Sequence, residues 1–498
     1  MKSGAIWYRT VAIAALAGVL GGCVLGPNFE RPRPPDETTY VPAPPASVEG
    51  PSLDYGADVA ADWYTLFHSD ALNALVHTAL ANNADLEAAR HGLAAAQAEL
   101  RAVAGSALPQ LDASAGVTRA RINGSFLYGP ADSFSASGNQ YSIGPTLAYT
   151  LDLFGGVRRS IESQAAATQN VREETLNTYI TLAGQVAVTA FNYASTDAQI
   201  RVTQEMVDNL RAQLDLTRRL EAAGKITRSD TLLAQTQLET TAATLPGLQR
   251  ERLAFGNALA ELLGKAPAEF TMPPLALDDF KLPQSVPVSL PSALVRQRLD
   301  VLAAEDRLHQ ASAEIGVAKA ARFPALTLSA QFSKEVSKLS EFSTPAADVW
   351  SLGLNLAAPI FNGGALAARE QAAHARYAQA EALYRSTVIG AFREVADSLQ
   401  SLELDEASHA AYESALASAR ASRDIVDAQF AAGSVNQLQV LTVQQQYLSA
   451  ALAEVQSRAK RFADVASLLH ALGGGWWNSP GDPASLPTKA ESSTGSSP

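Results

Sequence analysis

The chain contains one internal duplication, and this feature constrains its fold more than any other. The matching landmarks occur in the same order in both halves: Pro109 with Pro324, Ser142-x-Gly144 with Ser351-x-Gly353, and Ala223-Gly224 with Ala432-Gly433. Chance similarity between alanine-rich helices explains shared alanines but not this order of proline and glycine landmarks. We therefore expect two matching halves of one body, although 498 residues alone would suggest about three domains.

Each half contains two segments in which apolar and polar residues alternate. They cover about residues 110–121 and 140–152 in the first half, and 325–333 and 349–358 in the second. Strands of this length and period are typical of a transmembrane β-barrel wall. Half-buried hairpins of soluble proteins alternate in the same way, but two matching hairpins favour the barrel. The aromatic residues predicted to form its belt are Tyr141, Tyr149, Phe332 and Trp350.

A very long helix is expected after each pair of strands. Residues 157–223 and 365–432 contain no proline, so each stretch could form a helix of roughly 100 Å. Their apolar residues step by three and four, which is the spacing of a coiled-coil seam. Gly224 and Gly433 follow the pattern and predict the tips of two helical hairpins. A solid bundle is the alternative to a helical wall around a water-filled lumen.

Four strands are too few for a closed barrel, because small closed barrels have about eight. An open sheet edge in lipid would leave backbone groups unpaired. The chain must therefore oligomerise, and three copies would supply twelve strands. The predicted fold class is a mixed α and β membrane protein. Each chain provides four strands of a 12-stranded β-barrel, which continues into a long α-helical coiled-coil tunnel.

The N-terminus carries an export signal. A short basic region, an apolar segment too short to span a bilayer comfortably, and Gly21-Gly22 form the pattern of a signal peptide over residues 1–22. Cys23, the only cysteine, follows directly, and Leu20-Gly21-Gly22-Cys23 resembles the bacterial lipobox. We predict that Cys23 is lipidated with N-palmitoyl and S-diacylglycerol groups, whose acyl chains anchor the protein. An ordinary signal peptide with an incidental cysteine is the alternative.

Proline-rich segments separate the two repeats from the rest of the chain. Residues 23–60 are predicted to be a lipidated N-terminus followed by an extended spacer. The repeats cover residues 61–265 and 292–477, and residues 266–291 form a crossover linker expected outside the helical body. Residues 478–498 are polar and are predicted to be a disordered tail.

The sequence contains no recognisable catalytic or metal-binding constellation. No two of the seven histidines lie within four residues, so no HxxxH zinc pair exists, and there is no G-x-S-x-G motif. We therefore expect no enzyme activity, no metal site and no cofactor. A net charge of −12 without a basic block argues against nucleic-acid binding.

Several short segments together resemble a known family. In order, they are Cys23-Val24-Leu25-Gly26-Pro27-Asn28-Phe29, Trp63…Phe67…Asp70…Leu72…Leu75, Asn83-Ala84-Asp85-Leu86, Asp300-Val301…Glu305, Ile315-Gly316, Phe323-Pro324 and Pro359-Ile360-Phe361-Asn362-Gly363-Gly364. With this order and spacing, the chain resembles the TolC-like outer-membrane efflux channels, specifically the NodT or OprM-like lipoproteins. Leu299 departs from the family, which usually has proline there, and this should affect only a helix start.

The resemblance implies a homotrimer with a twelve-stranded barrel in the outer membrane and a twelve-helix tunnel through the periplasm. The implied partners are a periplasmic membrane-fusion adaptor that docks at the tips, an inner-membrane RND pump, and outer-membrane lipid. Asp230 matches an acid that in the family helps to hold the tip closed. Gly224, Asp230 and Gly433 are therefore the predicted tip and gate residues.

The resemblance implies that the lumen acids of the family's best-known member fall on uncharged residues here, Gln439 and Thr442. The carboxylate ring is absent at those positions, which puts any cation selectivity attributed to it in doubt. Asp424 and Asp427 precede the second tip and could take the place of the ring. Surface solvation is the favoured role for both residues.

We hypothesise that the chain is the outer-membrane channel of a tripartite efflux system, a passive duct that exports small molecules. Its partners would supply the energy. A type I protein-secretion duct is an alternative of the same class, and a structural coiled-coil lipoprotein of the envelope is an alternative of a different class. The expected location is the outer membrane of a Gram-negative bacterium, with a lipid anchor and a periplasmic extension.

Overall fold

The computed structural model describes residues 24–41, 51–123 and 135–485. The predicted signal peptide, the predicted lipidation site Cys23 and the end of the predicted tail lie outside these residues. The chain divides into two compact units. The sheet unit comprises Met1–Pro32, Ala94–Asn170 and Ala304–Tyr384, and the helical unit comprises Arg33–Leu93, Val171–Ala303 and Arg385–Pro498.

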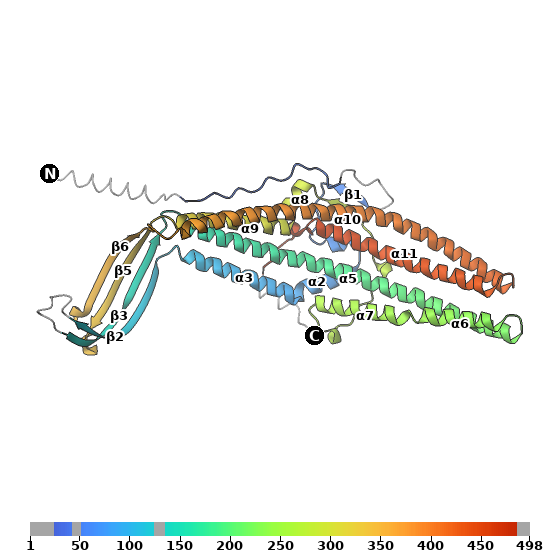
Figure 1. Ribbon diagram of the computed structural model, residues 1–498. Helices are drawn as coiled ribbons and strands as arrows, with labels where there is room; N and C mark the ends of the chain where they lie inside the picture. Colours follow the sequence, from blue (N-terminus) through green and yellow to red (C-terminus); the bar gives the residue numbers. More distant parts are fainter. Residues whose placement is uncertain (1–23, 42–50, 124–134, 486–498) are drawn as a thin grey trace. The chain divides into compact units, whose positions relative to one another are not determined.

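Helices make up most of the chain, and two of them, α5 and α10, are each 67 residues long (Figure 1). The helices are α2 (Asp70–Asn82), α3 (Ala84–Gly105), α5 (Gly156–Ala222), α6 (Arg228–Ala242), α7 (Leu245–Leu262), α8 (Pro291–Gln297), α9 (Leu299–Ala320), α10 (Ala365–Ala431) and α11 (Gln437–Ala471). The strands are β1 (Ser52–Tyr55), β2 (Gln110–Asn123), β3 (Ser135–Leu151), β4 (Ser285–Val288), β5 (Ala325–Val336) and β6 (Asp348–Ala357). None of the helices among the described residues is long and apolar enough to cross a membrane.

The sheet unit is built around an antiparallel sheet with the strand order β2-β3-β5-β6 (Figure 1). Each half of the duplication contributes one hairpin, and β3 pairs with β5 to join them. A glycine is required at position 144, because a Cβ there would lie 2.0 Å from the carbonyl oxygen of Phe332. β3 begins at Ser135 rather than near 140, and β5 continues to Val336. Polar residues extend both strands beyond the segment that alternates.

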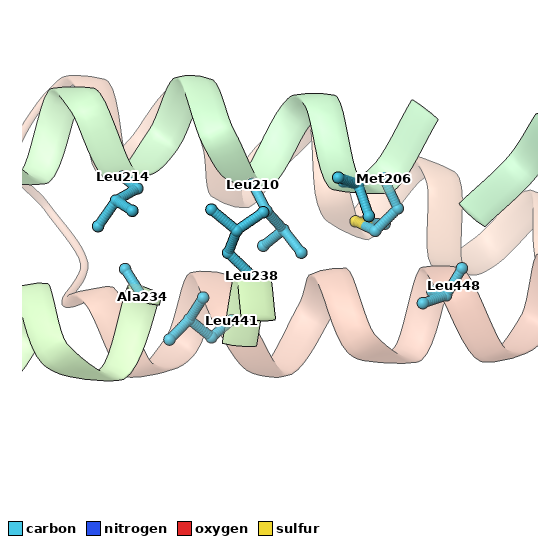
Figure 2. Close-up of a cluster of buried hydrophobic side chains, with 8 residues drawn as sticks. Met206, Leu210, Leu214, Ala234, Leu238, Leu441 and Leu448 are labelled. Carbon is cyan, nitrogen blue, oxygen red and sulfur yellow. The ribbon is translucent and has the colours of Figure 1, made fainter. Parts of the chain in front are cut away.

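Two clusters form the core of the helical unit. In the first, phenylalanines from separate segments pack edge to face or tilted, with ring centroids 4.9 to 6.2 Å apart; they are Phe67, Phe191, Phe280 and Phe462. The second, which we call the hairpin core, joins α5, α6 and α11; it contains Met206, Val207, Leu210, Leu214, Ala234, Leu238, Leu441 and Leu448. Figure 2 shows Leu210 and Leu214 facing Leu238 and Ala234. The apolar residues of α5 that step by three and four therefore form a packed seam against α6 and α11.

The return helix of the first half is interrupted, whereas that of the second half is continuous. α6 ends at Ala242, and α7 begins at Leu245 with Pro246 in its first turn. Proline is well placed there, because the first backbone N–H groups of a helix have no partner within it. The matching segment of the second half is the single helix α11.

The proline-rich segments are more ordered than a free spacer and a peripheral linker would be. β1 of the spacer pairs in parallel with β4 of the linker, with Leu53 opposite Val286, and the side chain of Val286 is fully buried. Tyr40 Oη donates to the carbonyl oxygen of Ser289 at 2.7 Å. Proline excludes helix but still permits short edge strands, so an extended spacer and the linker can pair with each other. Composition cannot show which strands pair.

The beginning of the predicted tail is also ordered. Ala484 is buried beside Leu93 and Leu176, and Asp482 forms an ion pair with Arg172 at 3.3 Å. Arg90 donates two hydrogen bonds to the carbonyl oxygen of Pro483, at 3.1 and 3.2 Å. The prediction of disorder was therefore wrong for residues 478–485. One small buried side chain, one ion pair and the hydrogen bonds from Arg90 hold this segment in place, and polar composition does not reveal these contacts.

Candidate functional site

The register gives the sheet one apolar face. Tyr141 lies opposite Val117 on one side and Val336 on the other, and Phe332 lies opposite Trp350. Because alternate residues of a strand share a face, all four predicted belt residues lie on this face. Its other aliphatic members are Leu111, Ala113, Ala115, Val117, Ile143, Pro145, Leu147, Leu151, Leu326, Leu328, Ala330, Leu352, Leu354 and Leu356.

Much of this apolar face is exposed in the single chain. The exposed fractions of Trp350 and Leu352 are 73% and 68%, and a soluble protein rarely leaves such a continuous apolar surface uncovered. The eight steps from Tyr141 to Tyr149 span about 27 Å along the strand. For a strand tilted as in outer-membrane barrels, this corresponds to about 20 Å of membrane thickness, near the height of their apolar band. The face has the dimensions of a lipid-contacting wall.

The opposite face of the sheet is polar and small. It carries the alternate serine, threonine, glycine, asparagine and glutamine residues of the four strands. Gln140 Nε2 donates to Glu335 Oε2 across β3 and β5 at 2.9 Å. A face of this kind can be hydrated, so the sheet can separate lipid from water.

The chain that follows Cys23 is attached to the helix-side end of the sheet. The N–H of Leu25 donates to the carbonyl oxygen of Phe154, between β3 and α5, at 3.1 Å. Gly26 has a φ of +92°, and a Cβ there would lie 2.5 Å from the Cα of Gly316 in α9. Both the close approach and the backbone conformation therefore require glycine at position 26.

A buried arginine completes this attachment, which we call the N-terminal clip. Arg159 donates to Asn28 Oδ1 at 2.8 Å and forms an ion pair with Glu162 at 2.6 Å. His309 Nε2 shares a 3.0 Å hydrogen bond with Glu162 Oε1, and the ring of Phe29 stacks on His309 at 4.3 Å. Burial alone would raise the pKa of Glu162, but hydrogen bonds to His309 and Arg159 outweigh it and lower this pKa. An ionised carboxylate therefore holds the clip together.

Both long helices end in the same glycine motif at the two predicted tips. Gly224 and Gly433 have φ values of +69° and +74°. The N–H groups of Lys225 and Ser434 each donate to the carbonyl oxygen five residues earlier, at 2.9 and 2.8 Å. This is the Schellman motif. A Cβ at either glycine would meet nothing within 4 Å, so the backbone conformation rather than crowding requires glycine.

Asp230, the predicted gate acid, belongs to the N-terminal cap of α6. The N–H and the hydroxyl of Thr227 donate to Asp230 Oδ2 at 2.9 and 2.7 Å, and the N–H of Asp230 donates back to the Thr227 hydroxyl at 3.3 Å. This is a capping box. At the second tip, Asn436 caps α11 by accepting from the N–H of Gln439 at 3.0 Å. Asp230 thus stabilises the start of its own helix.

The two acids before the second tip contact neighbouring side chains. Asp424 forms an ion pair with Arg423 at 2.8 Å, and the guanidinium of Arg423 lies 4.3 Å from the ring centre of Tyr447 in α11. Burial raises the pKa of Asp427 despite the opposing charge of Arg423. Arg423, Asp427 and Gln444 border a cavity of about 400 Å³ between α5, α10 and α11.

Comparison with known proteins identifies the family. The family model described as outer membrane efflux protein matches residues 75–265 and 290–474, which together make up well over half of the chain. The chain belongs to the outer membrane efflux protein family. Each matched segment falls in one half of the duplication, so both halves carry the family pattern. This is a family of channels rather than of enzymes.

Curated relatives of the outer membrane efflux protein family align over nearly the whole chain. The probable efflux pump outer membrane protein TtgC of Pseudomonas putida is 31% identical over 493 residues, covering 95% of this chain and 96% of that protein. The cation efflux system protein CusC of Escherichia coli is 29% identical over 471 residues, covering 93% and 97%.

Solved structures agree with this assignment. The structure of the outer-membrane channel OprN matches with a TM-score of 0.83 and 26% identity, covering 91% of this chain and 100% of that one. The TolC-like channel fold and the outer-membrane location expected from the sequence are confirmed.

The N-terminal clip is the functional feature that sequence reasoning missed. Gly26 and Gly316 were recognised only as marks of the family, and Arg159 was not singled out. A signal was nevertheless present, because two glycines at fixed places in one family pattern indicate close backbone contact. The sequence alone could not pair these two glycines across 290 residues.

Proposed function

We propose that three copies of the chain close one twelve-stranded barrel, through which small molecules leave the cell passively. The observation that carries the proposal is the four-stranded sheet with one apolar face. Its edge strands β2 and β6 have no partner strand among the described residues of one chain. Each unpaired backbone group would cost several kcal/mol in lipid. Pairing of β2 with β6 of the next copy removes every edge.

The protein serves as the outer-membrane channel of a tripartite efflux system. In our proposal, a periplasmic membrane-fusion adaptor contacts the hairpin tips around Gly224 and Gly433, and an inner-membrane RND pump supplies the energy. α6 and α11 begin at the two tips, and each has a capped N-terminus. This supports a surface of defined shape to which the adaptor can dock. Asp230 acts on the closed state by keeping α6 folded up to its first turn.

Lipidation of Cys23 would complete the membrane attachment. The N-terminal clip holds the next residues against the helix-side end of the sheet. Acyl chains on Cys23 would therefore enter the periplasmic leaflet beside the barrel, where they bury their methylene groups. This placement supports a role for the anchor in orienting the barrel as well as in retaining the protein.

The cargo is proposed only as a class of small solutes. CusC is named for cation efflux, whereas the other relative carries no cargo in its name. The polar face of the sheet supplies mainly uncharged hydrogen-bonding groups beside Asp112 and Glu335, and Gln439 and Thr442 are uncharged. A conduit of this kind discriminates weakly, so the pump rather than the channel would select the cargo.

Reconstitution into planar lipid bilayers tests the proposal. A trimeric duct is expected to give discrete conductance steps of uniform size. It should also co-purify with an adaptor and an RND pump when the three are expressed together. A purified protein that binds no adaptor and gives no conductance, even after its tips are loosened by mutation, would instead support a structural envelope lipoprotein.

A further inference from the structure

A cavity of about 380 Å³ lies at the loop-side end of the apolar face. Four side chains of that face line it: Ala115, Val117, Tyr141 and Ile143. Leu339 and Phe342, from the connection between β5 and β6, supply further apolar walls. The volume lies within the range of small-ligand pockets, about 300–1,000 Å³. The cavity is therefore large enough for part of an apolar molecule.

A connected set of hydrogen-bonding side chains lies on the same face, next to residues that line the cavity. Arg119 follows Val117 by two residues, lies opposite Asn139, and donates to its Oδ1 at 3.5 Å. Asn139 Nδ2 donates to Tyr141 Oη at 3.4 Å. A guanidinium, an amide and a phenol hydroxyl thus form one connected group at the rim. Such a group can donate several hydrogen bonds to one anion.

The charges at this end of the apolar face are mainly positive. Lys334 lies opposite Ile143 and forms an ion pair with Asp348 at 2.6 Å. Arg121 lies on the same face, two residues beyond Arg119. Three cations, Arg119, Arg121 and Lys334, thus share this end of the face with one carboxylate, that of Asp348. No other charged residue of these strands lies on this face among the described residues.

An apolar cavity with cations along one edge matches a lipid with an anionic headgroup. Cations on the outer face of a barrel are tolerated near the membrane interface but not at mid-depth. Arg119 and Arg121 lie beyond the aliphatic residues that β2 places on this face, and Lys334 lies within two residues of the loop-side end of β5. The other end of the sheet continues into α3, α5, α9 and α10 (Figure 1). With those helices in the periplasm, the cations face the outer leaflet.

We propose that this rim and cavity bind lipid A, the phosphorylated glycolipid of the outer leaflet. Arg119 would contact a phosphate through two parallel N–H groups, with Asn139 and Tyr141 as further donors. One acyl chain would enter the cavity beside Val117 and Phe342. This lipid site is a function additional to the proposed channel. It rests on the proposal that the apolar face of the barrel contacts the membrane lipid. It would fix the depth of the barrel from the side opposite the N-terminal clip.

Native mass spectrometry of the full-length protein in detergent tests the site. The protein is titrated with diphosphorylated lipid A, with the same lipid after removal of its phosphates, and with phosphatidylglycerol. Arg119→Gln removes the charge, and Ala115→Leu fills the cavity but keeps the charge. Thr118→Gln is the matched control, because Thr118 lies on the opposite face of the same strand.

Wild type and Thr118→Gln are expected to retain lipid A equally. Arg119→Gln and Ala115→Leu should each weaken retention of lipid A by about tenfold or more. The first removes the charge that contacts the phosphate, and the second fills the space for the acyl chain. Dephosphorylated lipid A should bind the wild type as weakly as lipid A binds Arg119→Gln. Phosphatidylglycerol, which offers one phosphate instead of two, should bind the wild type more weakly than lipid A does. Equal retention by all variants, or equal retention of phosphatidylglycerol, would overturn the proposal. The same spectra report the number of copies, so failure of the lipid site is distinguished from failure of barrel closure.

Discussion

Replacing Asp464 with asparagine is expected to abolish a pH dependence in the packing of α10 against α11. Burial, the hydrogen bond to Asp405 and the charge of Asp405 raise the pKa of Asp464 to about 7, against the opposing charge of Lys460. Lys460 Nζ donates to Asp405 Oδ2. The pKa of Asp405 is lowered, because hydrogen bonds with Asp464 and Lys460 outweigh its burial. Near neutral pH the two carboxyl groups therefore share one proton between the helices.

The sign and size of the effect follow from linkage. The pKa of Asp464 is about 7 in the folded chain and about 3.9 in an unfolded one. The folded state thus holds an extra proton between these values. The stabilisation is complete below about pH 4 and is lost as the pH rises through about 7. Three pKa units correspond to about 4 kcal/mol, which we halve to about 2 kcal/mol because part of Asp464 remains in water.

The assay is the thermal midpoint of the purified protein, followed by circular dichroism between pH 5 and pH 8. The wild-type midpoint should fall by a few degrees as the pH rises, since the part of this stabilisation lost between pH 5 and pH 8, about 1.3 kcal/mol, shifts the midpoint of a large protein by that amount. Asp464→Asn should lose this dependence. Asp397→Asn, at an exposed position of α10, is the matched control and should follow the wild type. Parallel curves for wild type and Asp464→Asn would refute the shared proton.

Three further substitutions test separate parts of the account. Gly144→Ala should prevent assembly of the sheet, because its Cβ would lie 2.0 Å from a carbonyl oxygen. Gly138→Ala is the control: its Cβ would meet nothing within 4 Å, so this variant should assemble normally. Gel mobility before and after heating measures assembly. Asp230→Ala and Thr227→Ala each break the capping box at a cost of about 1 kcal/mol, so both should raise single-channel conductance and vancomycin sensitivity. No change in either measure would remove Asp230 from the gate. Cys23→Ser should abolish incorporation of labelled palmitate, and undiminished labelling would contradict lipidation at that residue.

The overall fold could be predicted because local patterns determine it. The proline-free stretches form α5 and α10, and a glycine in the left-handed conformation follows each one. Period-two alternation separates the sheet into an apolar and a polar face without reference to any distant residue. The duplication supplied the rest, since a weak pattern that occurs twice in one order is stronger than a single occurrence.

The contacts that escaped prediction all join segments far apart in the sequence. The pairing of β1 with β4, the approach of Gly26 to Gly316 and the burial of Ala484 leave no periodic trace. Proline density indicated only that these regions are not helical. The capping role of Asp230 could have been predicted from the sequence, because threonine followed three residues later by an acid is typical of a helix N-terminus. The family resemblance instead predicted that Asp230 is a gate residue.

The central claim is that β2 of one copy pairs with β6 of the next in a ring of three. In a Cys23→Ser background, one cysteine replaces Ala113 in β2 and a second replaces either Leu352 or Leu354 in β6. Within one chain, three strand spacings separate β2 from β6, or about 14 Å. A disulfide needs Cα atoms within about 7 Å, so any bond formed must join two chains.

Oxidation in intact outer membranes, followed by a non-reducing gel, gives the most direct measurement. Closure by three copies predicts a ladder of one, two and three chains in one of the two pairings, with the covalent trimer as its last step. A persistent monomer in both pairings, or a ladder that continues beyond three chains, would contradict closure of the barrel by three copies.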